Sequence, residues 1–343
     1  MLDIELFRKN LDKIIESERK RFKDPSIAEK VLEYDIKWRN IIQEIEDLRK
    51  KRNEISIKIG EFKKSGENKK AGESIEASKK IKERIDELEK LKDDYINERE
   101  KYRYMVGNIL HESVPVAETE DGNEILRIFG NLPKFNFKPL SHVDLVSKID
   151  GVDTKKASEI VGSRFYYLKG DLVLLNLALL KFALEKLIDK DYIPMWTPFF
   201  TKYEVMKAAA ELTDFENQLY KIQDEDLYMI ATSEQPLAAY HYDEIIEPER
   251  LPLKYAGISS CFRREAGSHG KDTLGIFRVH RFEKVEQFIF SNPEESWNHF
   301  EELIANAEEL YKKLKLPYRI TNIASGELND NASKKYDLEA WFP

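Results

Sequence analysis

The chain has 343 residues, of which 35% are charged and 41% are hydrophobic, and its formal net charge is −8 at pH 7. This length allows two domains, and the acidic balance excludes a protein that coats nucleic acid over its whole surface, although it permits a local basic patch. Because Cys261 is the only cysteine, an intramolecular disulfide and a cysteine-rich zinc site are also excluded.

Residues 1–23 at the N-terminus have the spacing of a short amphipathic helix, which Asp24 and Pro25 interrupt. Charged side chains fall within the first ten residues, so we expect no secretory signal peptide. No run of eighteen apolar residues occurs, so we also expect no membrane partner and a cytoplasmic protein.

The clearest periodic pattern runs from Val31 to Phe62, where mostly apolar residues recur at alternating steps of three and four. Such a seam needs a partner helix. Turn residues within 63–72 precede a second heptad-like run from Ile81 to Tyr102. The pattern predicts an antiparallel coiled-coil arm over about residues 27–104, with dimerisation through parallel helices as the less favoured alternative.

The end of this arm is basic although the protein is acidic. Between residues 49 and 70, nine basic side chains face only three acidic ones. A solvated helix face and contact with RNA phosphates both explain such a charge run, and the sequence alone leaves both open.

The second half of the chain is more apolar and predicts helices packed on an antiparallel sheet. Regular alternation of strands and helices is missing, as is a GxGxxG sequence, so a Rossmann domain is not expected. The expected helices are Leu172–Leu187 and Trp297–Leu314, and the expected strands are Tyr192–Phe200, Leu227–Ala231, Gly257–Phe262, Ile276–Phe282, Val285–Phe290 and Tyr318–Ile323.

Two of these strands carry a set of residues suited to a nucleotide. Arg263 and Glu265 alternate in the first, and Arg278, Phe282 and Glu286 follow at intervals of four in the next. Residues two or four apart in a strand share a face, which predicts one floor with two arginines, a phenylalanine and two carboxylates. Arginine suits phosphate oxygens, and phenylalanine can stack on a base. From the spacing alone, a cross-strand salt-bridge ladder around a core phenylalanine explains the pattern at least as well.

The same residues resemble motif 2 of the class II aminoacyl-tRNA synthetases, and the whole segment from Cys261 to Phe288 resembles that of the seryl-tRNA synthetase family of the archaeal and eukaryotic type. Further similarity lies in Gly162–Leu168, Thr232–Pro236 and Tyr336–Trp341, and the N-terminal hairpin is similar to the family's tRNA-binding arm. The resemblance implies an α+β fold with an antiparallel coiled-coil hairpin and a class II antiparallel β-sheet flanked by helices. It also implies a tRNA-binding domain at 1–110, a connector at 111–140 and a catalytic domain at 141–343.

The implied activity is that of a serine–tRNA ligase, which activates L-serine with ATP and Mg²⁺ and transfers it to tRNA(Ser), with tRNA(Sec) open as a second acceptor. By position, Arg263 holds the α-phosphate, Glu265 contacts the adenine side, Arg278 reaches the outer phosphates and Phe282 stacks on adenine. The positions that match the family's ATP site are Arg263, Arg264, Glu265, Arg278, Val279, His280, Arg281 and Phe282. Those that match its serine site are Thr232, Ser233, Glu234 and Glu286, and no residue matches a protein ligand for a metal.

Two further segments match places where the family contacts macromolecules. The loop Ala266–Gly275 corresponds to one that touches the tRNA acceptor end, and Tyr192–Phe200 is similar to motif 1, which builds a homodimer interface. The family's motif 1 glycine is missing, because 189–191 read Asp-Lys-Asp.

The C-terminal end departs from the family pattern. The chain stops at Trp341-Phe342-Pro343, before a segment like motif 3, so we expect an incomplete ATP site and a chain without full activity of its own. A non-catalytic tRNA-binding paralogue and a structural coiled-coil protein stay open as alternatives. A carrier-protein aminoacyl ligase is less favoured, because it has no need of a tRNA arm.

Overall fold

The computed structural model describes residues 1–209, 216–266 and 274–343, which form two compact units. The first consists of Met1–Glu124 and Asn322–Lys335, and the second of Ile125–Thr321 and Tyr336–Pro343. Across these described ranges, no helix combines the length and apolar character needed to cross a bilayer.

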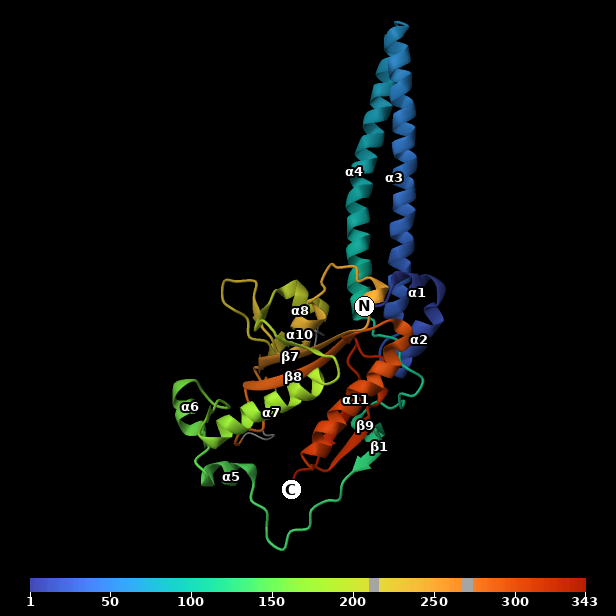
Figure 1. Cartoon of the computed structure of the whole chain (residues 1–343). Helices are drawn as coiled ribbons and strands as arrows, with labels where there is room; N and C mark the ends of the chain where they lie inside the picture. The colour runs from blue at the N-terminus through green and yellow to red at the C-terminus, as the bar shows by residue number, and fades with distance from the viewer. Residues whose placement is uncertain (210–215, 267–273) are drawn as a thin grey trace. The chain divides into compact units, whose positions relative to one another are not determined.

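Two long helices dominate the first unit and form the hairpin that the heptad pattern predicts (Figure 1). The helix α3 (Ser26–Lys64) has 39 residues, which corresponds to about 58 Å at ~1.5 Å per residue. The chain reverses at Gly66, whose φ of 77° lies in the left-handed region that glycine adopts without steric cost, and then enters α4 (Asn68–Met105). The seam buries Ile41, Ile45, Ile85 and Leu88.

The N-terminal segment differs from its prediction. It forms two helices, α1 (Ile4–Lys9) and α2 (Leu11–Lys20), where one was expected. The chain breaks at Asn10, which has a non-helical φ of −138°. Both helices contribute to a small core with the first turns of α3, in which Phe7, Ile14 and Val31 are fully buried.

A buried carboxylate lies at the base of the arm. Asp35 of α3 is fully buried, and its two oxygens accept hydrogen bonds from Nε and Nη2 of Arg8 at 2.8 Å each. Arg99 of α4 and Arg39 of α3 approach the same carboxylate at 3.0 Å each. The arrangement ties α1 and both arm helices to one point.

The sheet that carries the predicted site lies in the second unit, in the order β4 (Ile193–Trp196), β7 (Leu253–Phe262) and β8 (Arg281–Phe290). β7 and β8 pair antiparallel over ten residues each. β4 pairs parallel with β7, so this sheet is mixed rather than purely antiparallel. Parallel pairing requires a long crossover, which the chain between 197 and 252 provides.

The two faces of this sheet are covered by different helices (Figure 1). Leu237 of α10 (Glu234–Ala238) lies directly over Gly257, where an added Cβ would come within 2.7 Å of it. On the opposite face, Leu303 of α11 (Ser296–Lys313) and Leu184 of α7 (Asp171–Ile188) pack against a buried cluster that includes Ala256 of β7.

Short elements complete the second unit, and some differ from the sequence-based expectation. The strand expected at Ile276–Phe282 is wrong for residues 276–280, which are not in a strand; β8 begins at Arg281 and continues through the strand expected at Val285–Phe290. The stretch 111–140, expected to be only a connector, contains β1 (Glu124–Phe129), which pairs with β9. The remaining elements are α5 (His142–Lys148), β2 (Val152–Asp153), α6 (Thr154–Ile160), β3 (Tyr167–Leu168), β5 (Phe200–Thr201), α8 (Tyr203–Ala209), β6 (Tyr228–Met229), β9 (Tyr318–Asn322) and β10 (Tyr336–Ala340).

Candidate active site

The register of the β7–β8 hairpin decides which side chains share a face. Cys261 pairs with Phe282, and Gly257 pairs with Glu286. Directly opposed residues in an antiparallel pair point to the same side, and residues two apart along a strand do so as well. Phe282 and Glu286 therefore lie together on the face that α10 covers, as their spacing predicts.

The other three residues of the predicted floor do not lie in strands. β7 ends at Phe262, and β8 begins only at Arg281, so the expectation of regular strands through Arg263, Glu265 and Arg278 is wrong. Glu265 has a φ of 51° and Gly275 a φ of 71°, so the chain leaves extended conformation on both sides of the connection. Arg278 and Glu265 still meet, because Nη1 of the arginine donates to Oε2 of the carboxylate at 3.1 Å.

Arg263 is held on its side chain and on its backbone. Its Nε donates to the carbonyl of Ala231 at 3.2 Å, and its guanidinium lies 5.1 Å from the ring centroid of Phe282. Its backbone N–H donates to the carbonyl of His280 at 2.9 Å, and Nδ1 of His280 lies 2.8 Å from its carbonyl oxygen. The hydroxyl of Tyr220 lies 3.0 Å from the same Nδ1. Phe165 stacks on the imidazole at 4.8 Å and fixes the ring plane.

A hydrogen-bonded group lies on the α10 side of the hairpin. The hydroxyl of Thr232 donates to Oε2 of Glu286 at 3.1 Å. The same hydroxyl accepts from Nζ of Lys284 at 2.8 Å and from the backbone N–H of Glu234 at 3.3 Å. Lys284 also forms an ion pair with Glu286. Ser233 is fully buried, and its hydroxyl lies 2.7 Å from that of Ser259.

The charges of this group are coupled. Burial raises the pKa of the Glu234 carboxyl above its ordinary value, and the nearby charge of Glu286 raises it further. The ammonium group of Lys284 acts in the opposite direction. The site therefore holds two carboxyl groups and one cation, an arrangement suited to a ligand with its own ammonium group.

The remaining residues predicted for ATP lie around these groups. Val279 is buried, and Arg264 is exposed, with its backbone N–H donating to the carbonyl of Gln218 at 2.8 Å. The Arg281 side chain lies on the opposite face of the hairpin, where Nε donates to Ser260 at 3.3 Å. Only the backbone of Arg281 is left to line the face that carries Phe282.

Lys284 and Gln218 were not predicted from the sequence. Lys284 stands midway between Phe282 and Glu286, so an alternation of two along the strand would have identified it. Gln218 brackets Ala266 with both ends of its amide, because Nε2 donates to the Ala266 carbonyl at 2.7 Å and Oε1 accepts from its N–H at 3.1 Å. It lies far away in sequence, and no local pattern marks it.

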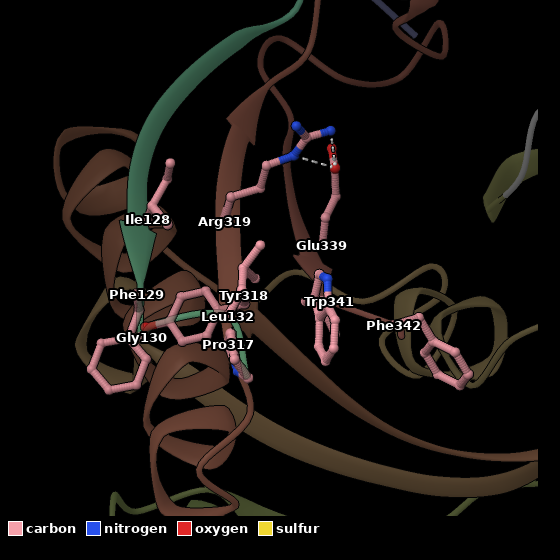
Figure 2. A pocket seen from close by; sticks show the side chains of 11 residues that line it. Ile128, Phe129, Gly130, Leu132, Pro317, Tyr318, Arg319, Glu339, Trp341 and Phe342 are labelled. Carbon is pink, nitrogen blue, oxygen red and sulfur yellow. Dashed lines mark hydrogen bonds and ion pairs between the residues drawn. The ribbon is translucent and has the colours of Figure 1, made fainter. Parts of the chain in front are cut away.

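A separate cavity of about 500 Å³ lies beside β9 (Figure 2). Ile128, Phe129 and Trp341 give it an apolar lining, and Arg319 and Glu339 form an ion pair at 2.6 Å at its edge. It contains none of the residues predicted for ATP or serine. In the part of the chain that the structure describes, no group of three metal-ligating side chains occurs.

Comparisons with known proteins agree on one family. Residues 1–110 match the model of the seryl-tRNA synthetase N-terminal domain, and residues 217–343 match the tRNA synthetase class II core domain (G, H, P, S and T). A serine–tRNA ligase of Methanosphaera stadtmanae is 56% identical over 343 residues, an alignment that covers 100% of this chain and 80% of that protein.

Solved structures give the same result. The seryl-tRNA synthetase of Pyrococcus horikoshii complexed with ATP superimposes with a TM-score of 0.93 at 42% identity, covering 99% of this chain and 81% of the other. The cytoplasmic serine–tRNA ligase of Naegleria fowleri in complex with AMP has a TM-score of 0.90 at 40% identity, with coverage of 100% and 82%.

Proposed function

The chain belongs to the serine–tRNA ligase family of class II aminoacyl-tRNA synthetases, and on this premise we propose that the α10-covered face of the β7–β8 hairpin activates L-serine with ATP. The observation that carries the proposal is the convergence of Phe282, Arg263, Glu286 and Thr232 at this face. One group of contacts then contains a ring that can stack on a base (Phe282), a cation that can bind phosphate (Arg263) and a polar pocket for an amino acid (Thr232 and Glu286).

The nucleotide half of the site follows from the contacts of Arg263. With its guanidinium 5.1 Å from the Phe282 ring, a base stacked on Phe282 would place its α-phosphate within reach of Arg263. Glu265 and Arg278 would contact the adenine side and the outer phosphates. Mg²⁺ would enter with the ATP phosphates and neutralise part of their charge.

The chemistry needs no nucleophile from the protein. A carboxylate oxygen of serine attacks the α-phosphorus, the bond to the bridging oxygen breaks, and seryl-adenylate and pyrophosphate form. Catalysis then depends on positioning and on stabilising the charge that develops at phosphorus, which is the role proposed for Arg263.

The serine half uses the polar group beside α10. We propose that the carboxylates of Glu234 and Glu286 and the hydroxyl of Thr232 receive the ammonium and hydroxyl groups of serine. An alanine in this pocket would leave buried hydrogen-bonding groups without partners, which disfavours it strongly. Threonine is excluded only because the pocket lacks space for its extra methyl group, and this steric effect discriminates less strongly than the loss of hydrogen bonds does.

Transfer to tRNA would use the basic arm and the loop after β7. The arm within the proposed domain 1–110 would bind the backbone of tRNA(Ser), with tRNA(Sec) open as a second acceptor. The loop Ala266–Gly275 would contact the acceptor end, although residues 267–273 of that loop lie outside the described residues. The segments 111–140 and 141–343 would serve as connector and catalytic domain.

We also propose a homodimer built through the segment Tyr192–Phe200. Trp196 is 77% exposed, and Leu177 of α7, which lines the same cavity as Trp196, is exposed by more than half. A cavity of about 750 Å³ opens beside them between α7 and the sheet. Contiguous exposed apolar side chains of this kind are typical of protein interfaces. A cytoplasmic location is supported by relatives in Bos taurus and Arabidopsis thaliana that are named as cytoplasmic enzymes.

The proposal is tested by ATP–pyrophosphate exchange on the full-length gene product, with serine, alanine, threonine and glycine as separate substrates. We expect exchange with serine and at least about a hundredfold lower kcat/KM with alanine, since buried polar groups would lose their partners. Exchange independent of the amino acid, or tRNA binding without any exchange, would contradict it.

A further inference from the structure

Lys284 holds a central position among the groups proposed to bind serine. Its Nζ donates to the Thr232 hydroxyl at 2.8 Å and pairs with the Glu286 carboxylate. The direction of the hydrogen bonds follows from chemistry, because the ammonium group and the N–H of Glu234 can only donate to the hydroxyl. The Thr232 hydroxyl therefore donates its single proton to Glu286. The side chains of Thr232, Lys284 and Glu286 thus each contact the other two.

The surroundings of Lys284 make it the cation that balances the pocket. The acidic groups facing it are Glu286 on its own strand and Glu234 from α10. Its partner across the hairpin is Ser259, which is neutral and already hydrogen-bonded to Ser233. Removal of the lysine charge would take away the cation that now offsets the charges of Glu234 and Glu286.

We propose that Lys284 is a positioning residue for serine: it orients the Thr232 hydroxyl and the Glu286 carboxylate and offsets one of the two carboxylate charges before the substrate arrives. The inference rests on the proposed function, since it assigns a role within the same pocket. A pocket held in this way keeps the Glu286 carboxylate in place for an incoming ammonium group. Without Lys284, part of the binding free energy of serine would be used to order these side chains.

The test compares two lysine-to-methionine variants of the full-length gene product in ATP–pyrophosphate exchange. Lys284→Met removes the ammonium group to which the positioning role is assigned, and Lys254→Met is the matched control. Lys254 lies on β7, points to the opposite face and pairs with Glu302 at 2.7 Å, so its loss removes a similar ion pair away from the pocket. We expect Lys284→Met to raise the KM for serine about tenfold or more, because charge-assisted hydrogen bonds are lost.

The KM for ATP should stay within about twofold in both variants, and Lys254→Met should leave the KM for serine unchanged. A purely structural role would instead lower kcat, or raise both KM values together. The double variant Lys284→Met/Thr232→Val provides a second measurement. If the residues act as one unit, its KM for serine is close to that of the more affected single variant, and multiplicative effects would overturn the proposal.

The outcomes also separate this inference from the proposed function. Absence of serine-dependent exchange in the unmodified protein would refute the function itself. Normal exchange in the unmodified protein, together with equal KM values for serine in Lys284→Met and Lys254→Met, would refute only the role of Lys284.

Discussion

Nη1 of Arg278 lies 3.1 Å from Oε2 of Glu265, although neither residue belongs to a strand. The pair joins the two ends of the connection between β7 and β8. Among the residues that the structure describes, none gives the buried Arg278 Nε a hydrogen-bond partner, whereas part of the side chain is exposed. A buried N–H donor of this kind costs stability unless a ligand accepts its hydrogen bond. This is consistent with an Arg278 guanidinium that donates to phosphate oxygens of ATP.

The first prediction concerns this arginine. Arg278→Met should raise the KM for ATP in the exchange reaction by about 10- to 100-fold, because one charge-assisted contact to phosphate is lost. The KM for serine should change by less than about threefold. Arg319→Met, which removes the ion pair with Glu339 beside the second cavity, is the control and should leave both KM values unaltered. Equal effects of the two variants would argue against a nucleotide role for Arg278.

The second prediction separates the arm from the chemistry. Deletion of residues 44–97 should lower tRNA charging by at least about a hundredfold, because the backbone contacts to RNA are lost. Serine-dependent exchange should remain within about threefold of the intact protein. A milder variant replaces Lys63, Lys64, Lys69 and Lys70 at the end of the arm by glutamine, and its charging should depend less steeply on salt. Charging that survives the deletion would refute the role of the arm.

The third prediction concerns the buried carboxylate at the arm base. Asp35→Asn should destabilise the first unit by about 3–5 kcal/mol, because Arg8, Arg39 and Arg99 lose their common counter-charge. Chemical unfolding measures this change when it is followed by circular dichroism at ~222 nm, a wavelength that reports on helix. The control is Glu44→Gln, which breaks an exposed pair with Arg84 and should have no measurable effect.

The Asp35 carboxylate also predicts that the stability of the first unit depends on pH. Burial alone would raise the pKa of Asp35, but its arginine partners outweigh this effect, so the pKa is lowered in the folded protein. A lowered carboxyl pKa gives stability that is present above the unfolded value and is lost as pH falls through the folded value. The free energy of unfolding of the first unit should therefore fall below about pH 4, and this fall should be smaller in Asp35→Asn.

The fourth prediction concerns Glu234, whose contribution to stability depends on pH in the opposite direction. Burial and the charge of Glu286 raise the pKa of Glu234, so the folded protein retains this proton at pH values where the unfolded chain has released it. Its contribution to stability is therefore greatest at low pH and declines as pH rises through the folded pKa. Glu234→Gln should melt at a higher temperature than the unmodified protein at pH 8, and the difference should disappear near about pH 4. An equal difference at both pH values would contradict this.

Regular patterns in the sequence were informative where one interaction dominates. The alternating steps of three and four from Val31 to Phe62 predict the coiled-coil hairpin correctly, since a continuous apolar seam has few other solutions. The four-residue spacing of Phe282 and Glu286 places both on one face for a similar reason. β1 was missed because its apolar residues lack the strict alternation of a half-buried strand.

The rest of the site depends on contacts between distant segments. Arg278 was expected in a strand, but the turn at Gly275 displaces it, and its meeting with Glu265 follows from the closure of the loop. Gln218 fixes the backbone of Ala266 across 48 positions, and no local pattern encodes that contact. Lys284 was overlooked because the family pattern draws attention to every fourth residue and not to those between.

The most direct measurement is a crystal structure of the full-length gene product with a non-hydrolysable seryl-adenylate analogue. We expect its adenine on Phe282, its phosphate mimic at the Arg263 guanidinium and its ammonium group within hydrogen-bond distance of Glu286. An analogue found elsewhere, for example in the apolar cavity lined by Phe129 and Trp341, would contradict the assignment of the chemistry to the β7–β8 hairpin.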